Sequence, residues 1–244
     1  MSLPRMEKFE LISFPNASEL AQAAADAWLK EIASVGDAPH CVALSGGRIA
    51  QSFFPAVATC AHAQKISFAT VHFFWADERC VSPESADSNF RLAQELLLSP
   101  LEIAKDHIHR LRSEEPADFA CAEAEAEICR LASLNSDGLP VLDLIFLGLG
   151  EDGHVASLFP GQPEPPKDGR FAYRAIANSP KPPPNRITLS YAALAVAKKV
   201  WVLASGAGKE ATLQESLKPD GKTPLARVIR SRSNTRVFTD IPVG

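Results

Sequence analysis

The 244-residue sequence contains few cysteines, and their arrangement disfavours two classes of protein. There are only five, an odd number, and no two of them are spaced as CxxC. This pattern is typical of reduced thiols in a cytosolic protein and argues against a disulfide framework or a zinc site. Cys80 lies beside Arg79, a cation that would lower a thiol pKa, but the sequence provides it with no histidine or carboxamide partner.

Basic residues are not in excess, and long apolar runs are missing. The 25 Lys and Arg residues are outnumbered by 29 Asp and Glu, which gives a formal net charge of -4, whereas nucleic-acid phosphates are normally met by clustered cations. No apolar run approaches the roughly 20 residues that span a bilayer, and residues 1–11 lack the basic-then-apolar order of a signal peptide. We expect a soluble, uncleaved cytoplasmic protein with no nucleic-acid or membrane partner, in which local cations still allow a small anionic ligand.

The common nucleotide-binding fingerprints are also missing. Ser45, Gly46 and Gly47 follow an apolar run and form a possible phosphate cradle, because glycines let backbone N–H groups approach an anion at a helix N-terminus. This is not a Walker A loop. GLGEDGH contains GxG, but His154 stands where a dinucleotide fingerprint needs a small residue. The sequence therefore disfavours a nucleotide cofactor.

Strand-like and helix-like segments alternate along the chain. This order predicts an α/β fold, with a three-layer, mostly parallel Rossmann-like sheet and helices on both faces. No composition break divides the sequence, so we expect residues 1–244 to form a single domain. Strands are expected at residues 9–14, 41–44, 71–75, 142–147, 171–176, 186–190, 200–204 and 237–239, and helices at 18–35, 48–63, 89–98, 118–134, 192–198 and 209–217, with a proline-rich loop over 162–184.

The segment LDLIFLGLGEDGHVASLFPG is the most informative part of the sequence. An apolar strand, typical of the middle of a parallel sheet, runs into a glycine-rich loop with Asp152 and His154. Ligands of such sheets bind where the strands end, so a carboxylate beside an imidazole there indicates an oriented general base. Two alternatives are open: Asp152 caps a following helix, or the pair binds a metal, although no further ligands are spaced for one.

Other polar residues follow predicted strands. Asp77 and Arg79 lie in a polar loop segment that follows the third strand and ends at Asn89. Two acids beside a base are typical of a solvated loop or a salt bridge, but at the end of a strand Arg79 is placed to bind a carboxylate, a carbonyl or a hydroxyl pair, and Asp77 and Asn89 to meet sugar hydroxyls. Arg186 and Lys209 are isolated cations at junctions between loops and elements, and each by itself is more typical of a surface charge.

Taken in order, SGG after a strand, ADERCVSPESADSNFRL, GLGEDGHVASLFPG, PNRITLS and ASGAGK resemble the 6-phosphogluconolactonase family, within the wider sugar-phosphate isomerase and deaminase superfamily. The resemblance covers nearly the whole chain. It implies hydrolysis of 6-phospho-D-glucono-1,5-lactone to 6-phosphogluconate in the oxidative pentose phosphate pathway, with no metal or organic cofactor. The expected state is a monomer or weak homodimer.

Matching positions give the residues their expected roles. His154 would be the general base, with Asp152 orienting its ring and Arg79 at the lactone end, where it would stabilise the oxyanion. The expected substrate-binding residues are Ser45, Gly46, Gly47, Arg48, Asp77, Asn89, Arg186 and Lys209. The chain departs from the family after SGG, where Arg48, Ile49 and Ala50 replace a pattern that includes a threonine. The phosphate site therefore lacks a threonine hydroxyl, although its backbone donors remain.

Three competing functions are considered. A glucosamine-6-phosphate deaminase or isomerase of the same superfamily would carry a glutamate five residues after the loop histidine, where this chain has Phe159. A sugar-phosphate sensor would need a DNA-binding module, and no helix-turn-helix segment precedes Phe9. A binding protein without catalysis is disfavoured by the retention of both Asp152 and His154.

Overall fold

The protein is built around a six-stranded parallel sheet. The structure is a computed structural model that describes residues 8–162 and 171–243. Every strand pair in this sheet is parallel, in the order β1-β11-β10-β7-β2-β3. Its strands are β1 (Phe9–Ser13), β2 (His40–Leu44), β3 (Val71–Trp75), β7 (Leu144–Gly148), β10 (Lys199–Ala204) and β11 (Thr235–Thr239).

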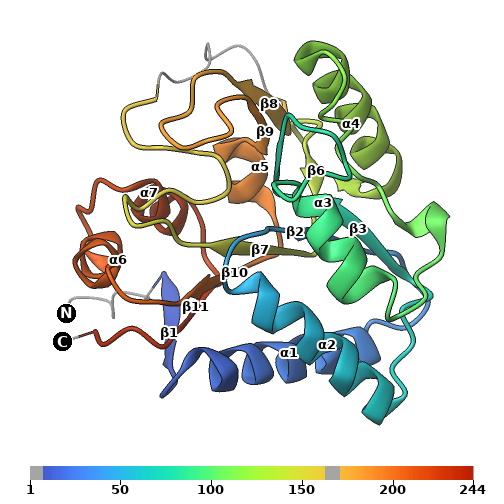
Figure 1. Ribbon diagram of the computed structural model, residues 1–244, viewed down its shortest axis with the longest axis horizontal. Helices are drawn as coiled ribbons and strands as arrows, with labels where there is room; N and C mark the ends of the chain where they lie inside the picture. Colours follow the sequence, from blue (N-terminus) through green and yellow to red (C-terminus); the bar gives the residue numbers. More distant parts are fainter. Residues whose placement is uncertain (1–7, 163–170, 244) are drawn as a thin grey trace.

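Helices cover both faces of the sheet (Figure 1), which confirms the predicted α/β architecture. α1 (Ala17–Ser34) and α2 (Ala50–Gln64) lie side by side on the lower face in this view. α5 (Tyr191–Val196), α6 (Glu210–Leu217) and α7 (Pro224–Ser231) lie on the opposite side. The side chain of Asn16 caps α1 by accepting a hydrogen bond from the backbone N–H of Glu19.

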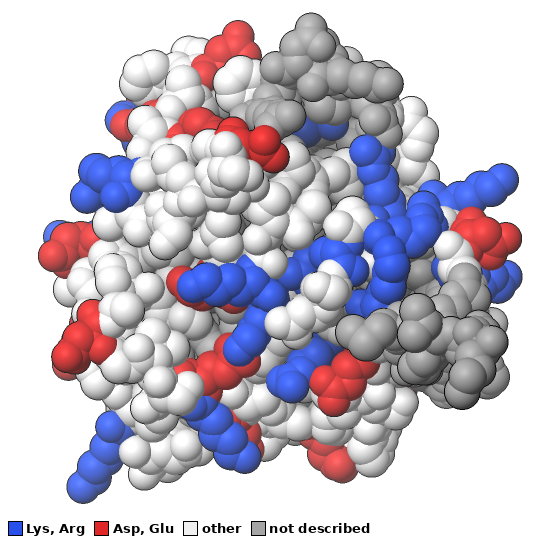
Figure 2. Space-filling view, turned by 180° about the vertical axis from the view of Figure 1, so that it is seen from behind, with Lys and Arg blue, Asp and Glu red and all other residues white. Residues whose placement is uncertain are grey.

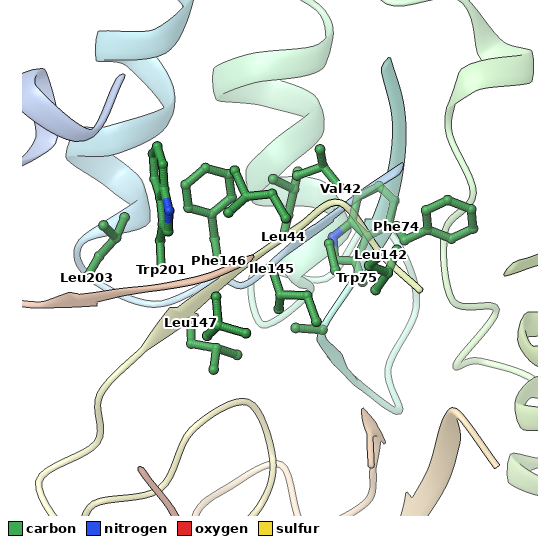
Figure 3. Close-up of a cluster of buried hydrophobic side chains, with 14 of the residues drawn as sticks. Val42, Leu44, Phe74, Trp75, Leu142, Ile145, Phe146, Leu147, Trp201 and Leu203 are labelled. Atoms are coloured by element: carbon green, nitrogen blue, oxygen red, sulfur yellow. The ribbon is translucent and has the colours of Figure 1, made fainter. Parts of the chain in front are cut away.

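The strands alternate side chains between the two layers of the core (Figure 3). Phe146 and Trp201 point to one side of the sheet and Leu147 to the other. Trp28 of α1 meets Phe146 with ring centroids 5.0 Å apart, and Phe146 meets Trp201 at 5.7 Å, both edge to face. Because the central strands are buried on both faces, the run of apolar residues in β7 is explained by its place in the sheet.

The strand order reverses between β2 and β7. From β2 the chain crosses α2 and adds β3 on one side, whereas from β7 it proceeds through β10 to β11 on the other. In open α/β sheets such a switch point leaves a crevice outside the carboxyl ends of the two strands. The two glycine-rich loops of the sequence follow these same two strands.

A separate three-stranded antiparallel sheet lies outside the main one, in the order β4-β9-β8. Its strands are β4 (Asp77–Arg79), β8 (Tyr173–Ile176) and β9 (Arg186–Leu189). The prediction that residues 77–79 belong to a loop was wrong, because pairing with β9 orders this polar tripeptide. The strands predicted at 171–176 and 186–190 exist, but they belong to this second sheet.

The remaining elements differ from the prediction in detail. α3 (Asn89–Ala93) passes into a π-helical turn, η1 (Gln94–Leu98), within the single helix predicted at 89–98. α4 (Ala117–Leu131) ends before residues 133–134, where a short strand, β5 (Ser133–Leu134), pairs with β6 (Pro140–Val141). A short 3₁₀ helix, η2 (Lys105–His107), was not predicted, and neither were β5, β6 and α7. Residues 163–170 of the predicted proline-rich loop lie outside the described residues.

Two features of the structure concern the predictions that the protein binds neither a membrane nor a nucleic acid. Among the described helices, none combines the length and apolar character needed to cross a bilayer. Although the net charge is -4, Lys and Arg side chains gather in a band across the face shown in Figure 2, with Asp and Glu mostly around it. Local concentrations of cations therefore coexist with an acidic composition.

Candidate active site

A cleft opens at the switch point, and most of the predicted site residues line it. Its cavity volume is about 100 Å³. The predicted residues that line it are Ser45, Gly46, Gly47, Arg48, Asp77, Arg79, Asn89, His154, Arg186 and Lys209. Asp152 is not part of the lining. Sequence reasoning missed Ile49, Gly148, Leu149, Gly150 and Ala156, which complete the walls with apolar or small side chains.

His154 and Asp152 form a hydrogen-bonded pair at the rim of the cleft. Nδ1 of His154 lies 2.5 Å from Oδ1 of Asp152, and the same oxygen accepts the backbone N–H of His154 at 3.3 Å. Since an ionised carboxylate only accepts, Nδ1 carries the proton and Nε2 is left unprotonated in the neutral ring. Gly150 permits this arrangement, because a Cβ there would stand 2.0 Å from Nδ1 of His154.

Burial and the interaction between the two side chains shift the pKa of each in opposite directions. Burial lowers the pKa of His154 below its ordinary value of 6.5, although the hydrogen bond and charge of Asp152 raise it. Burial is the largest single influence on Asp152 and would raise its pKa, but the hydrogen bonds and charge of His154, with the charge of Lys181, together outweigh it, so the pKa lies below its ordinary value. The pair therefore has a neutral imidazole and an ionised carboxylate at neutral pH, which is the state required of a general base.

The turn after β2 presents backbone donors to the cleft. Oγ of Ser45 donates to the carbonyl of Phe146 at 2.9 Å, which ties this turn to β7. Among the described residues, no hydrogen bond uses the amide N–H groups of Gly46, Gly47 and Arg48. These groups lie just before α2, which begins at Ala50 rather than at residue 48. Free amides before a helix N-terminus bind anions readily.

Two arginines stand opposite each other across the small antiparallel sheet. Arg79 of β4 pairs in register with Arg186 of β9, and residues directly opposite in such a pair point to the same face. Like charges placed this way repel each other, so an anion between them is favoured. Nη1 of Arg79 donates to the carbonyl of Asp87 at 2.6 Å, whereas its buried Nε has no partner among the described residues.

Arg186 is buried and held on several sides. Its Nε donates to the carbonyl of Pro183 at 3.0 Å, and its Nη2 donates to the carbonyls of Lys181 and Pro182 at 3.2 and 3.0 Å. Nη1 donates to Oγ of Ser157 at 3.3 Å. Burial lowers the pKa of this arginine from its ordinary value, but a guanidinium stays charged in proteins. The interpretation of Arg186 as a surface charge is therefore wrong.

Ser157 links Arg186 to Asp77 and was missed by sequence reasoning. It is fully buried, and its Oγ donates to Oδ2 of Asp77 at 2.7 Å while accepting from Arg186. Nδ2 of Asn89 donates to the backbone carbonyl of Asp77 at 2.9 Å and lies 3.4 Å from its Oδ1. The cleft wall is therefore one connected polar network. A lone serine in VASLF carries no sequence signal for such a role.

Glu78 is a second buried residue that the sequence did not single out. Its carboxylate accepts the backbone N–H groups of Arg79, Asn89 and Phe90 and the hydroxyl of Ser88, at 2.7 to 3.1 Å. Burial raises its pKa, which the three backbone donors partly offset. The carboxylate ties β4 to the N-terminus of α3 and so positions Arg79 and Asn89. An acid three residues after the strand and a serine N-cap were the available signals.

The remaining cations differ sharply in exposure. Lys209 is buried at the N-cap of α6, where Nζ donates to the carbonyl of Ser205 at 2.6 Å. Burial lowers its pKa, and the charge of Arg48 adds to this effect. Arg48 itself is exposed and lies 3.3 Å from the carboxylate of Glu151. Both face the cleft, but only Lys209 has lost most of its hydration.

Three hypotheses from the sequence can be compared with this geometry. No helix follows Asp152 within residues 152–162, so the helix-cap interpretation is wrong. Among the described residues, no group of three or more His, Cys, Asp and Glu side chains is arranged to hold a metal ion. Burial raises the pKa of the Cys80 thiol, contrary to the activation by Arg79 that was considered.

The fold and the cleft together define a class of protein. A parallel α/β sheet whose switch-point cleft combines buried cations with an imidazole–carboxylate pair is an α/β enzyme scaffold for small anionic substrates. Comparison with known proteins gives the family. The model of the family described as glucosamine-6-phosphate isomerases/6-phosphogluconolactonase matches residues 15–238, so the chain belongs to this family.

Similar proteins agree with this assignment. The chain is 32% identical over 232 residues to a 6-phosphogluconolactonase of Aggregatibacter actinomycetemcomitans, covering 94% of this chain and 96% of that protein. It is 33% identical over 209 residues to the chloroplastic 6-phosphogluconolactonase 3 of Arabidopsis thaliana, covering 83% of this chain but only 64% of that longer relative.

Solved structures share the fold over nearly the full length. The 6-phosphogluconolactonase from Trypanosoma brucei superposes with a TM-score of 0.82 at 29% identity, covering 95% of this chain and 96% of that one. A monomeric glucosamine-6-phosphate deaminase superposes with a TM-score of 0.79 at 16% identity, covering 94% and 96%. The second likeness is one of fold alone, so it does not distinguish between the two activities.

Proposed function

We propose that this chain hydrolyses 6-phospho-D-glucono-1,5-lactone to 6-phospho-D-gluconate, a step of the oxidative pentose phosphate pathway. The family and the named relatives support this activity. The observation that carries it is the shared cleft. His154, which is suited to activate water, lines the same cavity as Arg186 and Lys209, which are suited to hold a phosphate.

His154 acts as the general base. Its Nδ1 donates to Asp152, so Nε2 accepts a proton from the water that attacks the lactone carbonyl carbon. The resulting tetrahedral intermediate collapses by breaking the bond between this carbon and the ring oxygen, and the imidazolium returns its proton to that oxygen. Asp152 keeps the ring in the required tautomer and stabilises the imidazolium as it forms.

Arg79 stabilises the oxyanion of that intermediate. Its buried Nε–H has no acceptor among the described residues, and a preorganised donor of this kind is most effective where water is excluded. Arg186, Lys209 and the free amides after Ser45 hold the phosphate, with Arg48 at the outer edge. Asp77 and Asn89 face the sugar hydroxyls. Ile49 lines the cleft and offers no hydroxyl there, so backbone donors take the place of the threonine found in the family pattern.

The proposal extends to the domain organisation, the location and the oligomeric state of the protein. Residues 1–244 form a single domain, in keeping with one hydrophobic cluster that runs from α1 to β11. The proposal includes a cytoplasmic location and a monomeric or weakly homodimeric state. Light scattering of the purified protein between micromolar and hundred-micromolar concentrations tests the state, and a stable higher oligomer would contradict it.

The test uses freshly generated 6-phosphogluconolactone, with the spontaneous hydrolysis rate subtracted. The wild-type protein should accelerate ring opening, and His154→Asn should lower kcat by about 10² to 10⁴. His62→Asn, at an exposed position in α2, is the matched control and should keep the wild-type rate. Near-normal turnover by His154→Asn would remove the proposed base.

The deaminase alternative is tested in parallel. Phe159 occupies the position where the related deaminases carry a glutamate, and its ring packs against His154 with centroids 4.5 Å apart. Without that carboxylate, proton transfer between sugar carbons lacks its acid or base. Release of ammonia from glucosamine 6-phosphate at a rate above that of lactone hydrolysis would reverse the assignment. Tight binding of 6-phosphogluconate without any acceleration would instead indicate a binding protein.

A further inference from the structure

Phe159 lies behind the cleft and contacts two of its functional side chains. The ring is buried and does not line the cleft itself. Its centroid lies 4.5 Å from that of the His154 imidazole, with the planes inclined by 35°. Cζ of Arg186 lies over the ring at 5.5 Å from its centroid. One aromatic side chain therefore contacts both the catalytic loop and β9.

The contact with Phe159 restricts the orientation of the His154 imidazole. Asp152 holds the imidazole at one edge through Nδ1, but a single hydrogen bond leaves the ring free to tilt about it. The face of Phe159 limits this tilt by packing against the imidazole. It also keeps water from that side of His154, which contributes to the burial that lowers the imidazole pKa.

The same ring limits the position of Arg186. Carbonyl groups and Ser157 accept hydrogen bonds from the guanidinium, and its Cζ lies over the ring of Phe159. A cation over an aromatic face within about 6 Å is attracted to it. Because His154 serves the reacting carbon and Arg186 the phosphate, the separation of these two groups determines which length of phosphorylated lactone fits.

We propose that Phe159 is a positioning residue that fixes the imidazole of His154 relative to the guanidinium of Arg186, and thereby sets the geometry of the cleft for a phosphorylated sugar lactone. The inference rests on the proposed lactonase function for its kinetic consequences. Phe159 acts through two other residues and not by contact with substrate. Misplacement of reacting groups by about 1 Å is enough to lose about a hundredfold in rate.

The experiment compares Phe159→Leu, which keeps an apolar side chain but removes the aromatic face, with Phe159→Tyr, which keeps that face. Phe68→Leu is the matched control, since Phe68 is a buried ring that packs against Trp28 and Phe73 away from the cleft. For each variant, Tm, kcat, KM and the pH dependence of kcat/KM are measured. The imidazole pKa of His154 is measured by NMR, with its signal assigned by its loss in His154→Asn.

Phe159→Leu should lower kcat/KM at least tenfold, raise KM for the phosphorylated lactone, and move the His154 pKa upward as water reaches the ring. Phe159→Tyr should remain within a few-fold of wild type, and Phe68→Leu should lower Tm without changing kcat/KM or the pKa. A wild-type pKa and kcat/KM in Phe159→Leu, whatever its Tm, would show a packing role and overturn the proposal. Equal impairment of Phe159→Tyr and Phe159→Leu would overturn it too.

These experiments test the lactonase function and the positioning role of Phe159 independently. A wild-type protein that does not accelerate lactone hydrolysis would contradict the proposed function. The His154 pKa in Phe159→Leu would still be measured in that case, so it decides whether the ring positions and shields the imidazole.

Discussion

The side-chain oxygen of Asn89 packs against Gly46 so closely that a Cβ atom at residue 46 would stand 1.9 Å from it. Asn89 begins α3 and Gly46 follows β2, so this contact joins two segments that both line the cleft. It explains why the second position of the SGG turn requires glycine on grounds of space, since the φ of Gly46 is not in the left-handed region.

Gly46→Ala should therefore destabilise the protein because Asn89 must move away and lose its hydrogen bond to the carbonyl of Asp77. Overpacking of this kind costs about 1–3 kcal/mol. In the background of Asn89→Ala the obstacle is absent, so the same substitution at Gly46 should cost much less. Urea denaturation of the wild type, both single variants and the double variant measures this coupling. An equal loss in both backgrounds would show that Asn89 is not the obstacle.

The pH dependence of kcat/KM should report the buried imidazole. His154 must be neutral to accept a proton, so activity falls as the pH drops through its pKa. Burial lowers that pKa below 6.5, and the acid limb should lie correspondingly below the limb of an exposed histidine. Asp152 raises the pKa of His154. Asp152→Asn should therefore move the limb to still lower pH, while the plateau rate falls because the imidazolium loses its stabilising charge.

Rates measured in small steps from pH 4 to 8, with spontaneous hydrolysis subtracted at each pH, check this prediction. Asp26→Asn is a suitable control, because Asp26 lies on α1 and accepts hydrogen bonds only from Gln22 and Gln64 among the described residues. A limb that moves to higher pH in Asp152→Asn would contradict the assigned direction of the interaction.

The position of the cleft could be predicted from sequence because its main parts follow buried parallel strands. The apolar runs of β2 and β7 identify central strands, and the glycine-rich turns after them hold Gly46 and His154. Since strands of a parallel sheet end at the same edge, these residues had to come together. The buried state of Arg186 and Lys209 had no such signal, because most of their acceptors are backbone carbonyls, at residues 181–183 and 205, and a backbone carbonyl is present at every position of a sequence.

β4 of the small antiparallel sheet and α7 are two elements that the hydrophobic pattern of the sequence does not predict. β4 is Asp-Glu-Arg, three polar residues that are weak strand formers, and only its pairing with β9 makes it a strand. α7 has eight residues, too few to be stable alone. Its start was nevertheless encoded, since Thr223 accepts from the backbone N–H of Ala226 and Pro224 occupies the first turn.

Two of the three phosphate-side cations, Lys209 and Arg48, should contribute unequally to substrate binding. Lys209 is buried, so Lys209→Met should raise KM for the phosphorylated lactone by about 10- to 100-fold, as expected for a lost charged hydrogen bond of about 1.5–3 kcal/mol. Arg48 is 72% exposed and paired with Glu151, so Arg48→Ala should raise KM by less than about fivefold.

Kinetics with the phosphorylated and the unphosphorylated lactone distinguish the loss of a phosphate contact from a general loss of structure. The effect of Lys209→Met should disappear with the unphosphorylated substrate, because no phosphate is present to bind. A similar rise in KM for both substrates would place Lys209 outside the phosphate site. A larger rise in KM in Arg48→Ala than in Lys209→Met would contradict the order that the burial of the two side chains predicts.

Ser157→Ala should damage both stability and substrate binding. The hydroxyl is fully buried, and its removal leaves an oxygen of Asp77 without its 2.7 Å donor and Nη1 of Arg186 without its acceptor. Buried polar groups without partners cost about 1–3 kcal/mol, and a protein of this size loses roughly 2–4 °C in Tm per kcal/mol. Arg186 then gains freedom to move, so KM for the phosphorylated lactone should rise together with the fall in Tm.

Ser34→Ala is the matched control for this substitution. Its hydroxyl also donates one hydrogen bond, in this case to the carbonyl of Glu31 at 2.7 Å, but it is exposed at the end of α1, where water replaces the lost bond. Its effect on the free energy of unfolding should stay within about 0.5 kcal/mol. If Ser157→Ala behaves like Ser34→Ala in thermal unfolding and in KM, then Asp77 and Arg186 hold each other without the serine, and the connected wall of the cleft does not depend on it.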